Sequence, residues 1–75
     1  MSSHEIIEIP IRDNMIRLGQ LLKLASLVGD GVEATEFIKN GQVKVNGDVE
    51  ERRGRQLHPG DTVSINNETV RITSE

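Results

Sequence analysis

The fold is decided in the stretch Ile38-Lys39-Asn40-Gly41-Gln42-Val43-Lys44-Val45-Asn46-Gly47-Asp48-Val49, where the spacing of apolar side chains changes from helical to strand-like. Before Gly41 the apolar residues recur every three or four positions, and after it they alternate with polar residues. Gly41 is expected to end the helix, because glycine enters the left-handed conformation at little cost. Asn46-Gly47 is a strong signal for a tight hairpin turn, so Val49 is expected to open the return strand.

Two helices are predicted on the N-terminal side of this stretch. The first carries an apolar stripe at one face of a helix, formed by Leu18, Leu21, Leu22 and Ala25. We expect Gly29 to end this helix. The second is expected to begin at Asp30, with Glu33 three residues later at the spacing of a capping box. Its buried face is expected to consist of Ala34, Phe37 and Ile38.

Strands are predicted toward both ends of the chain. Residues 5–11 are rich in β-branched side chains and contain Pro10, which cannot donate a ladder hydrogen bond, so this strand should lie at a sheet edge. A polar loop at residues 50–56 is followed by Leu57 and by a turn at residues 58–61. The last two strands and the turn between them are expected at Val63 and Ile65, Asn66-Asn67, and Val70 and Ile72. The predicted class is α+β, with two helices against a small, mostly antiparallel sheet.

Size and composition limit what the chain can be. Its 75 residues can build one hydrophobic core, so a single domain spanning residues 1–75 is expected. The absence of cysteine excludes disulfides and thiolate metal sites. The N-terminus lacks the pattern of a signal peptide, and the longest near-apolar stretch, residues 18–28, is too short and polar to span a bilayer. We therefore expect a cytoplasmic monomer that does not engage a membrane.

Charge is distributed unevenly along the chain. The formal net charge of −3, taken alone, argues against nucleic-acid binding. Residues 1–38 carry a net −3, residues 39–55 a net +2 and residues 56–75 a net −2. Because the local field rather than the total charge attracts a polyanion, the middle segment is a candidate nucleic-acid surface.

The ordered motifs of the chain resemble the S4 RNA-binding domain, also called the alpha-L motif. The resemblance is carried by Ile16-Arg17-Leu18-Gly19-Gln20-Leu21-Leu22-Lys23-Leu24-Ala25, by Ala34, Ile38 and Gly41, by Val43-Lys44-Val45-Asn46-Gly47, by Arg52-Arg53-Gly54-Arg55-Gln56-Leu57 and by Pro59-Gly60-Asp61. These segments cover about residues 16–65 and look most like the small bacterial stand-alone members of the family. The resemblance implies a two-helix alpha-L motif packed on a small sheet, and binding to structured RNA, with ribosomal or transfer RNA as the expected targets.

Two features depart from the family pattern. Larger members often have an acidic residue where Gly19 sits, and a Ser-Arg pair at the start of the second helix, which here reads Gly29-Asp30-Gly31-Val32-Glu33. Small members often have lysine at the position of Thr35. Without the arginine of the Ser-Arg pair and the lysine at position 35, the helix face that the resemblance implicates in RNA contact is less basic in this chain.

The best candidate for function is Arg52-Arg53-Gly54-Arg55. Arginine is permanently charged, and its planar guanidinium matches two phosphate oxygens at once. Gly54 lets the backbone bend, so the three side chains need not alternate as they would in a strand. The alternative is a solvated loop in which the arginines pair with Glu50 and Glu51; the resemblance favours RNA contact.

Further candidate RNA contacts are Arg17, Lys23, Lys39, Gln42, Lys44 and Asn46. Lys23 is expected to project from the exposed side of the first helix. Arg17 lies near the start of that helix, where a cation opposes the helix dipole, and this hints at an external partner. Lys39 has an alternative role in completing the end of the second helix. The two amides suit ribose or base edges, although Asn46 has the hairpin turn as an alternative role.

Catalysis, metals and cofactors are not indicated. The histidines, His4 and His58, form no Ser/His/Asp or metal-ligand spacing, and no phosphate-binding glycine loop is present. An enzyme, a cofactor and a small-molecule substrate are therefore not expected. Phe37 is the only aromatic residue and is expected in the core, so recognition should rely on the shape and phosphates of folded RNA rather than on base stacking.

A protein-interaction adaptor is the rival interpretation. Such an adaptor would use the same fold and the same basic loop on an acidic protein partner, ribosomal or otherwise. The net charge of −3 favours it, whereas the arginines and the family resemblance favour RNA.

Overall fold

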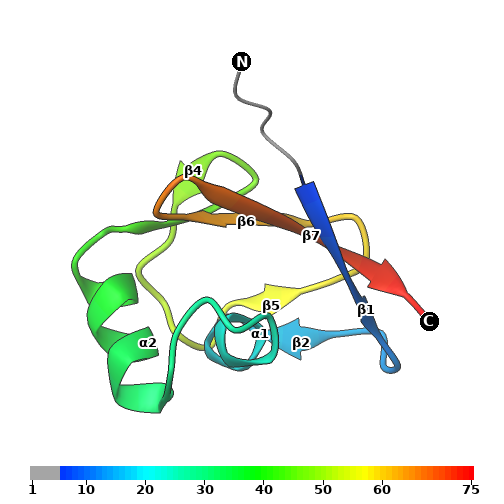
Figure 1. Ribbon diagram of the computed structural model, residues 1–75, viewed down its shortest axis with the longest axis horizontal. Helices are drawn as coiled ribbons and strands as arrows, with labels where there is room; N and C mark the ends of the chain where they lie inside the picture. The colour runs from blue at the N-terminus through cyan, green and yellow to red at the C-terminus, as the bar shows by residue number, and fades with distance from the viewer. Residues whose placement is uncertain (1–5) are drawn as a thin grey trace.

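A computed structural model describes residues 6–75 and shows two layers, with the helices beneath one face of a sheet (Figure 1). In chain order the elements are β1 Ile6–Ile11, β2 Ile16–Arg17, α1 Leu18–Leu24, α2 Gly31–Lys39, β3 Val43–Val45, β4 Asp48–Val49, β5 Gln56–Leu57, β6 Thr62–Ile65 and β7 Glu68–Ser74. The predicted α+β class is confirmed. His4 and the first residue of the strand predicted at residues 5–11 lie outside the described residues.

The larger sheet has five strands in the order β1-β7-β6-β3-β4. Strand β1 pairs in parallel with β7, and the other neighbouring strands are antiparallel. The edge position predicted from Pro10 is confirmed. Alternation along β3 buries Val43 and Val45 and leaves Lys44 exposed, so one face of the sheet packs on the helices while the other meets solvent.

A second, two-stranded sheet pairs β2 with β5. Its register places Ile16 opposite Leu57 and Arg17 opposite Gln56. The sequence did not predict β2, because two residues are too few to show a period. This short ladder brings the start of α1 beside the end of the predicted polar loop, because β5 begins at its last residue, Gln56.

The core is aliphatic and draws on both layers. Its largest fully buried side chains are Leu18, Leu21, Leu22, Ile38, Leu57, Ile72, Val43, Val45, Val63 and Val70. The stripe predicted for the first helix is confirmed except at Ala25, which is only partly buried. Phe37 is also partly buried and packs against the core, as the prediction of a core role requires.

The two helices end in the same way with different residues. Gly41 follows α2 at a φ of 72°, with its N–H bonded to Ile38 O and that of Gln42 bonded to Phe37 O. This is a Schellman motif, and the predicted end of the second helix is confirmed.

The prediction that Gly29 ends the first helix is wrong. Helix α1 ends at Leu24, and Ser26 takes the left-handed conformation at a φ of 59°. The N–H groups of Ser26 and Leu27 bond to Lys23 O and Leu22 O, which completes a second Schellman motif. The left-handed residue that ends the helix is therefore Ser26, three positions before the predicted Gly29.

The start of α2 agrees closely with its predicted cap. The Asp30 carboxylate accepts a hydrogen bond from Glu33 N at 2.8 Å. Glu33 Oε1 accepts from Gly29 N at 2.5 Å, one residue before the donor of a standard capping box.

The predicted hairpin is also confirmed, since Asn46 and Gly47 take φ values of 53° and 91° between β3 and β4. No helix within residues 6–75 is long and apolar enough to cross a membrane.

Candidate nucleic-acid interface

A buried carboxylate organises the arginine loop, residues 50–55. Glu50 is 6% exposed, and its two oxygens lie 2.9 Å from Arg52 Nε and 2.6 Å from Arg55 Nη1. The same carboxylate accepts from the backbone N–H of Arg52 at 3.0 Å. Hydrogen bonds from Arg52 and then Arg55 lower the pKa of Glu50 to about 2, despite its burial. Glu50 is therefore ionised at neutral pH, and two of the three loop arginines have a fixed internal partner.

The alternative considered from the sequence, pairing of the arginines with Glu50 and Glu51, is therefore correct for one of the two acids. Within residues 6–75 no ion pair involves Glu51. The pairing does not remove the guanidinium groups from solvent, because the Arg52 side chain remains 74% exposed and that of Arg55 34% exposed. An arginine offers five N–H donors, so both side chains keep donors for an external phosphate.

The arginine loop also caps helix α1. Three donors at the start of the helix bond to three consecutive loop carbonyls: Leu18 N to Arg55 O at 2.9 Å, Gly19 N to Arg53 O at 3.0 Å, and Arg17 Nη1 to Gly54 O at 2.9 Å. The first N–H groups of a helix have no partner within the helix, and the residue at the N-cap here, Arg17, has no side-chain oxygen that could accept from them. The carbonyl groups of the arginine loop accept from these N–H groups instead, and the same hydrogen bonds hold the loop against α1.

Arg53 lies across two glycines, one in each helix. A Cβ atom on Gly19 would come within 2.9 Å of Arg53 Cγ and 3.0 Å of its Nε, and a Cβ on Gly31 within 3.2 Å of its Nη2. In the described part of the chain no carboxylate forms an ion pair with Arg53. Gly19 and Gly31 thus make room for an arginine that lies between α1 and α2, and both belong to positions where the chain departs from the family pattern.

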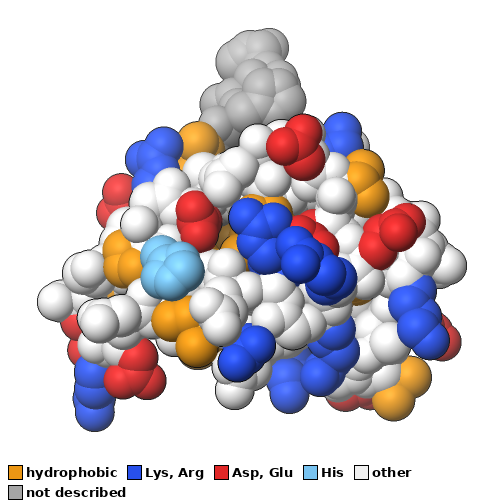
Figure 2. Space-filling model, turned by 180° about the vertical axis from the view of Figure 1, so that it is seen from behind, with side chains coloured by type: hydrophobic (Ala, Val, Ile, Leu, Met, Phe, Trp, Pro, Cys, Tyr) orange, Lys and Arg blue, Asp and Glu red, His pale blue; other side chains and the backbone are white. Residues whose placement is uncertain are grey.

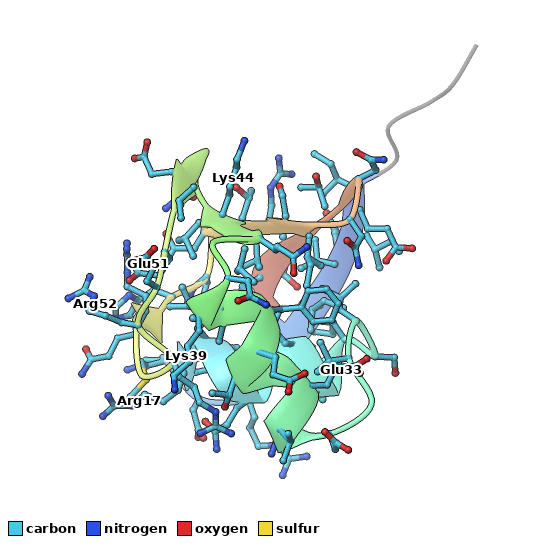
Figure 3. The ribbon with its side chains drawn as sticks, turned by 90° about the vertical axis from the view of Figure 1, so that its left-hand side faces the viewer. Arg17, Glu33, Lys39, Lys44, Glu51 and Arg52 are labelled. Atoms are coloured by element: carbon cyan, nitrogen blue, oxygen red, sulfur yellow. The ribbon has the colours of Figure 1, made fainter. Side chains whose placement is uncertain are left out.

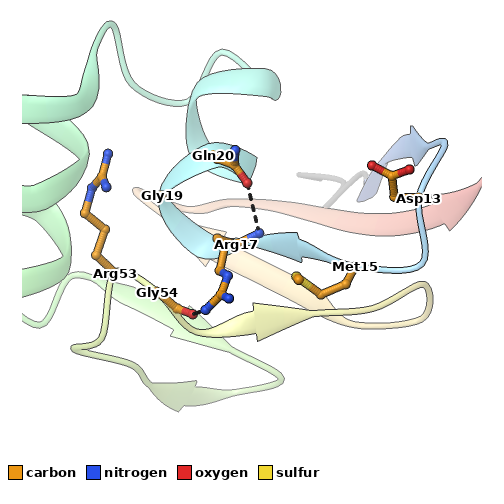
Figure 4. A pocket seen from close by; sticks show the side chains of 7 residues that line it. All are labelled: Asp13, Met15, Arg17, Gly19, Gln20, Arg53 and Gly54. Atoms are coloured by element: carbon orange, nitrogen blue, oxygen red, sulfur yellow. Dashed lines mark hydrogen bonds between the residues drawn. The ribbon is translucent and has the colours of Figure 1, made fainter.

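Two open hollows border these arginines. The first has a volume of about 590 Å³. In Figure 4, Arg17 and Arg53 lie on opposite sides of Gly19, with Gln20 beside Arg17 and with Met15 and Asp13 beyond it. The second, of about 510 Å³, is lined by Arg17, Arg52, Gly54, Arg55, Gln56 and His58. Arg17 borders both hollows, so the four arginines of the arginine cluster, Arg17, Arg52, Arg53 and Arg55, surround one continuous region of surface.

Two lysines extend this basic surface along the helices. Lys23 follows Gly19 by one helical turn, and Lys39 follows Gly31 by two, so each lies on the face that meets Arg53. Figure 2 shows Lys and Arg side chains gathered in a band on this side of the molecule, beside a histidine. In Figure 3, Lys39 projects to the same side as Arg17 and Arg52, whereas Glu33 lies on the other side of α2.

The other candidates from the sequence lie elsewhere. Gln42 and Lys44 line a separate hollow with residues 64–67, and Lys44 stands at the top of the sheet in Figure 3, away from Arg17 and Arg52. The Asn46 amide donates to Asp61 Oδ1 at 3.1 Å and accepts from Thr62 N at 2.9 Å, so it joins the hairpin turn to the start of β6. The structure therefore divides the predicted RNA contacts into three groups. The four arginines lie together with Lys23 and Lys39, Gln42 and Lys44 lie at the sheet, and Asn46 has a structural role in the hairpin.

Two features of the site escaped the sequence analysis. Arg17 was taken to hint at an external partner, but it has an internal acceptor in Gly54 O, which lies 37 positions away in the chain. Glu50 was considered only as a surface partner for the arginines, whereas it is buried beneath them. Across residues 6–75, no group of three His, Asp or Glu side chains is placed to hold a metal ion.

Known proteins resemble the chain in sequence and in structure. The sequence profile of the S4 domain matches residues 9–73. The chain is 46% identical over 57 residues to a probable ribosome maturation protein, RlbA, of Bacillus subtilis, covering 76% of this chain and 80% of that protein. It is 37% identical over 59 residues to a putative RNA-binding protein, YbcJ, of Escherichia coli, covering 79% and 84% of the two chains.

Two solved structures resemble the fold. The solution structure of E. coli YbcJ, described as revealing an alfaL motif involved in RNA binding, matches with a TM-score of 0.65 and 32% identity over 99% of this chain and 92% of that one. The 30S ribosomal protein S4e of Thermoplasma acidophilum matches with a TM-score of 0.61 and 26% identity, over 80% of this chain and 32% of that protein. The predicted alpha-L architecture is thereby confirmed.

Proposed function

Because this chain belongs to the S4 domain family, as its motifs predicted, we propose that it binds structured RNA through phosphate contacts made by the arginine cluster. The family is one of RNA-binding domains rather than of enzymes, and for this chain we propose a non-catalytic role as a cytoplasmic monomer. The observation that carries the proposal is a surface of four arginines from two segments of the chain. Glu50 holds Arg52 and Arg55, the Gly54 carbonyl holds Arg17, and all four side chains border hollows that are open to solvent.

The proposed mechanism is electrostatic. Guanidinium groups at the two hollows replace condensed counterions along the RNA backbone, and the released ions drive binding. Four neutralised phosphates predict a slope of about −3 for log affinity against log salt. Phe37, the one Phe, Tyr or Trp residue of the chain, is partly buried and packs against the core, so it is a poor platform for base stacking. Phosphate contact with folded RNA is therefore favoured over base stacking on a single strand.

Ribosomal RNA is the first target that we propose, with transfer RNA as the second. The printed description of the B. subtilis relative, a probable ribosome maturation protein, supports this order. A protein on the ribosome could share the interface with the RNA, and the outer face of the sheet would remain available to it.

Fluorescence anisotropy with a structured ribosomal RNA fragment and a single-stranded control, across a salt series, tests the proposal. Arg53→Gln is the informative variant, because Arg53 forms no ion pair within the described structure and its loss leaves Glu50 satisfied. We expect it to weaken binding about fivefold and to reduce the salt slope by about 1. Arg71→Gln, an equal change of charge at an exposed position of β7, is the matched control and should have little effect.

Two results would contradict the proposal. Equal losses in Arg53→Gln and Arg71→Gln would show that only total charge matters. Absence of binding by the wild type at low salt would exclude RNA as the ligand and direct the search to an acidic protein partner.

A further inference from the structure

Glu50 is an anion at the centre of a surface proposed to bind a polyanion. We infer that Glu50 is a positioning residue that raises affinity for RNA, because it holds Arg52 and Arg55 in the arrangement that meets phosphate. This inference rests on the proposed function. It predicts the opposite of simple electrostatics, in which removal of any negative charge from the surface would strengthen binding.

The hydrogen bonds divide so that the two arginines are held and still have free donors. Glu50 Oε2 accepts from Arg52 N and Nε at 3.0 and 2.9 Å, and Oε1 accepts from Arg55 Nη1 at 2.6 Å. A longer contact of 3.3 Å joins Arg52 Nη2 to Oε1. Arg55 thus directs one of its donors inward, and Arg52 two of its side-chain donors. The remaining guanidinium N–H groups are free to bind phosphate oxygens.

Rigidity is the property that Glu50 supplies. A long arginine side chain loses conformational freedom when it binds a ligand, and this loss weakens binding unless it has already occurred in the free protein. Burial of the Glu50 carboxylate makes its position well defined, so the two guanidinium groups are ordered before RNA arrives. The cost of ordering them is then met during folding rather than during binding.

The effect of Glu50 extends to the rest of the arginine cluster. Its bond to the Arg52 N–H fixes the backbone at the start of the Arg52-Arg53-Gly54-Arg55 turn. The carbonyls of Arg53 and Gly54 in that turn then bond to Gly19 N and Arg17 Nη1. Loss of the carboxylate geometry would therefore disturb Arg17 and Arg53 as well, although neither touches Glu50 in an ion pair.

Three variants separate geometry from charge. Glu50→Gln removes the charge and the geometry together, because its amide N–H₂ cannot accept from arginine. Glu50→Asp keeps the charge but is one methylene shorter, so it cannot reach both arginines in the observed positions. Glu51→Gln removes the same charge from the neighbouring exposed residue, which forms no ion pair in residues 6–75, and leaves the geometry intact.

Affinity for the structured ribosomal RNA fragment is measured for each variant, at a temperature where circular dichroism shows it to be folded. Glu50→Gln and Glu50→Asp should each bind about fivefold to tenfold more weakly than the wild type, with a salt slope reduced by about 1. Glu51→Gln should bind slightly more tightly. Binding by Glu50→Gln that equals or exceeds that of Glu51→Gln would overturn the inference.

A second measurement, made without RNA, tests whether Glu50 holds the two arginines in place. The order of the arginine side chains is read from ¹⁵N relaxation of their Nε–H groups. The Arg52 and Arg55 signals should lose order in both Glu50 variants and keep it in Glu51→Gln. Unchanged order in the Glu50 variants would overturn the inference. Failure of the wild type to bind RNA, with these signals behaving as expected, would instead defeat the proposed function and leave the positioning role of Glu50 standing.

Discussion

At the scale of single residues, missing side chains shape the candidate interface as much as charged ones do. Gly19 and Gly31 leave the space that Arg53 occupies, and the closest approach would be 2.9 Å if Gly19 had a Cβ. Arg53 is exposed and forms no ion pair in the described part of the chain, so nothing else of comparable strength fixes it there. The position of this cation therefore depends on glycine rather than on a partner.

Gly19→Ala should consequently weaken RNA binding without lowering the stability of the fold. The added methyl group displaces Arg53, which should weaken RNA binding by about 1 kcal/mol, or roughly fivefold. Stability should stay constant or rise by up to about 1 kcal/mol, because alanine favours helix more than glycine does. Anisotropy and urea denaturation measure the two effects. Gly29→Ala, whose Cβ would meet only the Glu33 carboxylate at 3.4 Å, is the control, and an equal loss of binding there would contradict the role of Gly19.

The depressed pKa of Glu50 predicts how stability depends on pH. The arginine hydrogen bonds lower this pKa from 4.5 to about 2, so the carboxylate stabilises the fold above pH 4.5 and this contribution is lost as the pH falls toward 2. We expect a loss of about 2 kcal/mol or less over that window, because solvent screens the exposed Arg52. Denaturation at several pH values should show this loss in the wild type and in Glu51→Gln, and a flatter profile in Glu50→Gln. Parallel profiles for all three proteins would contradict the assignment.

At the scale of elements, helix α1 and the arginine loop depend on each other. A helix of seven residues is too short to be stable by itself, and the N-cap side chain of this one, Arg17, accepts from none of its first N–H groups. The loop carbonyls satisfy its first N–H groups, and the two-residue ladder of β2 and β5 joins the same two segments. The segment proposed to bind RNA is thus also the N-terminal cap of the helix on which it rests.

The C-terminal ends of the two helices offer a stability test. Ser26 holds a φ of 59°, which costs a residue with a Cβ roughly 1 kcal/mol relative to glycine. Ser26→Gly should therefore raise the free energy of unfolding by about 0.5 kcal/mol, after the greater freedom of glycine in the unfolded chain is subtracted. Gly41→Ala, at a φ of 72°, is the converse change and should destabilise by about 1 kcal/mol. Urea denaturation measures both effects. Destabilisation by Ser26→Gly would show that the Ser26 hydroxyl stabilises the fold by more than the left-handed backbone conformation costs.

These elements also show how far the sequence could predict the structure. Helix α2 and the β3–β4 hairpin were predictable because their caps, apolar spacing and Asn46-Gly47 turn are local signals. The end of α1 was not, because serine rarely takes the conformation that Ser26 adopts. The arginines were recognised as candidates, but the burial of Glu50 was not, since glutamate is usually exposed and its partners form only when the loop folds. Contacts between Arg53 and the two helices likewise join segments distant in the chain.

At the scale of the whole molecule, the distribution of charge would orient the protein on RNA. The net charge is −3, yet the arginine cluster, Lys23 and Lys39 lie around the start of α1 and along its contact with α2. Glu33 lies on the other side of α2, and Lys44 points away from the cluster at the sheet (Figure 3). RNA should therefore approach the side of the arginine loop, where attraction exceeds the repulsion from acids elsewhere.

That orientation predicts that added charge will matter only where it faces the RNA. Thr35 lies one turn after Gly31 and one turn before Lys39, so Thr35→Lys would add a cation between Arg53 and Lys39. We expect binding to structured RNA to strengthen about threefold and the salt slope to steepen by about 1. Glu68→Gln, at an exposed position at the start of β7, changes the net charge by the same amount and is the matched control. Anisotropy across a salt series compares them: equal gains would mean that net charge governs binding, whereas a gain confined to Thr35→Lys would mean that RNA lies along the helix face beside the arginine cluster.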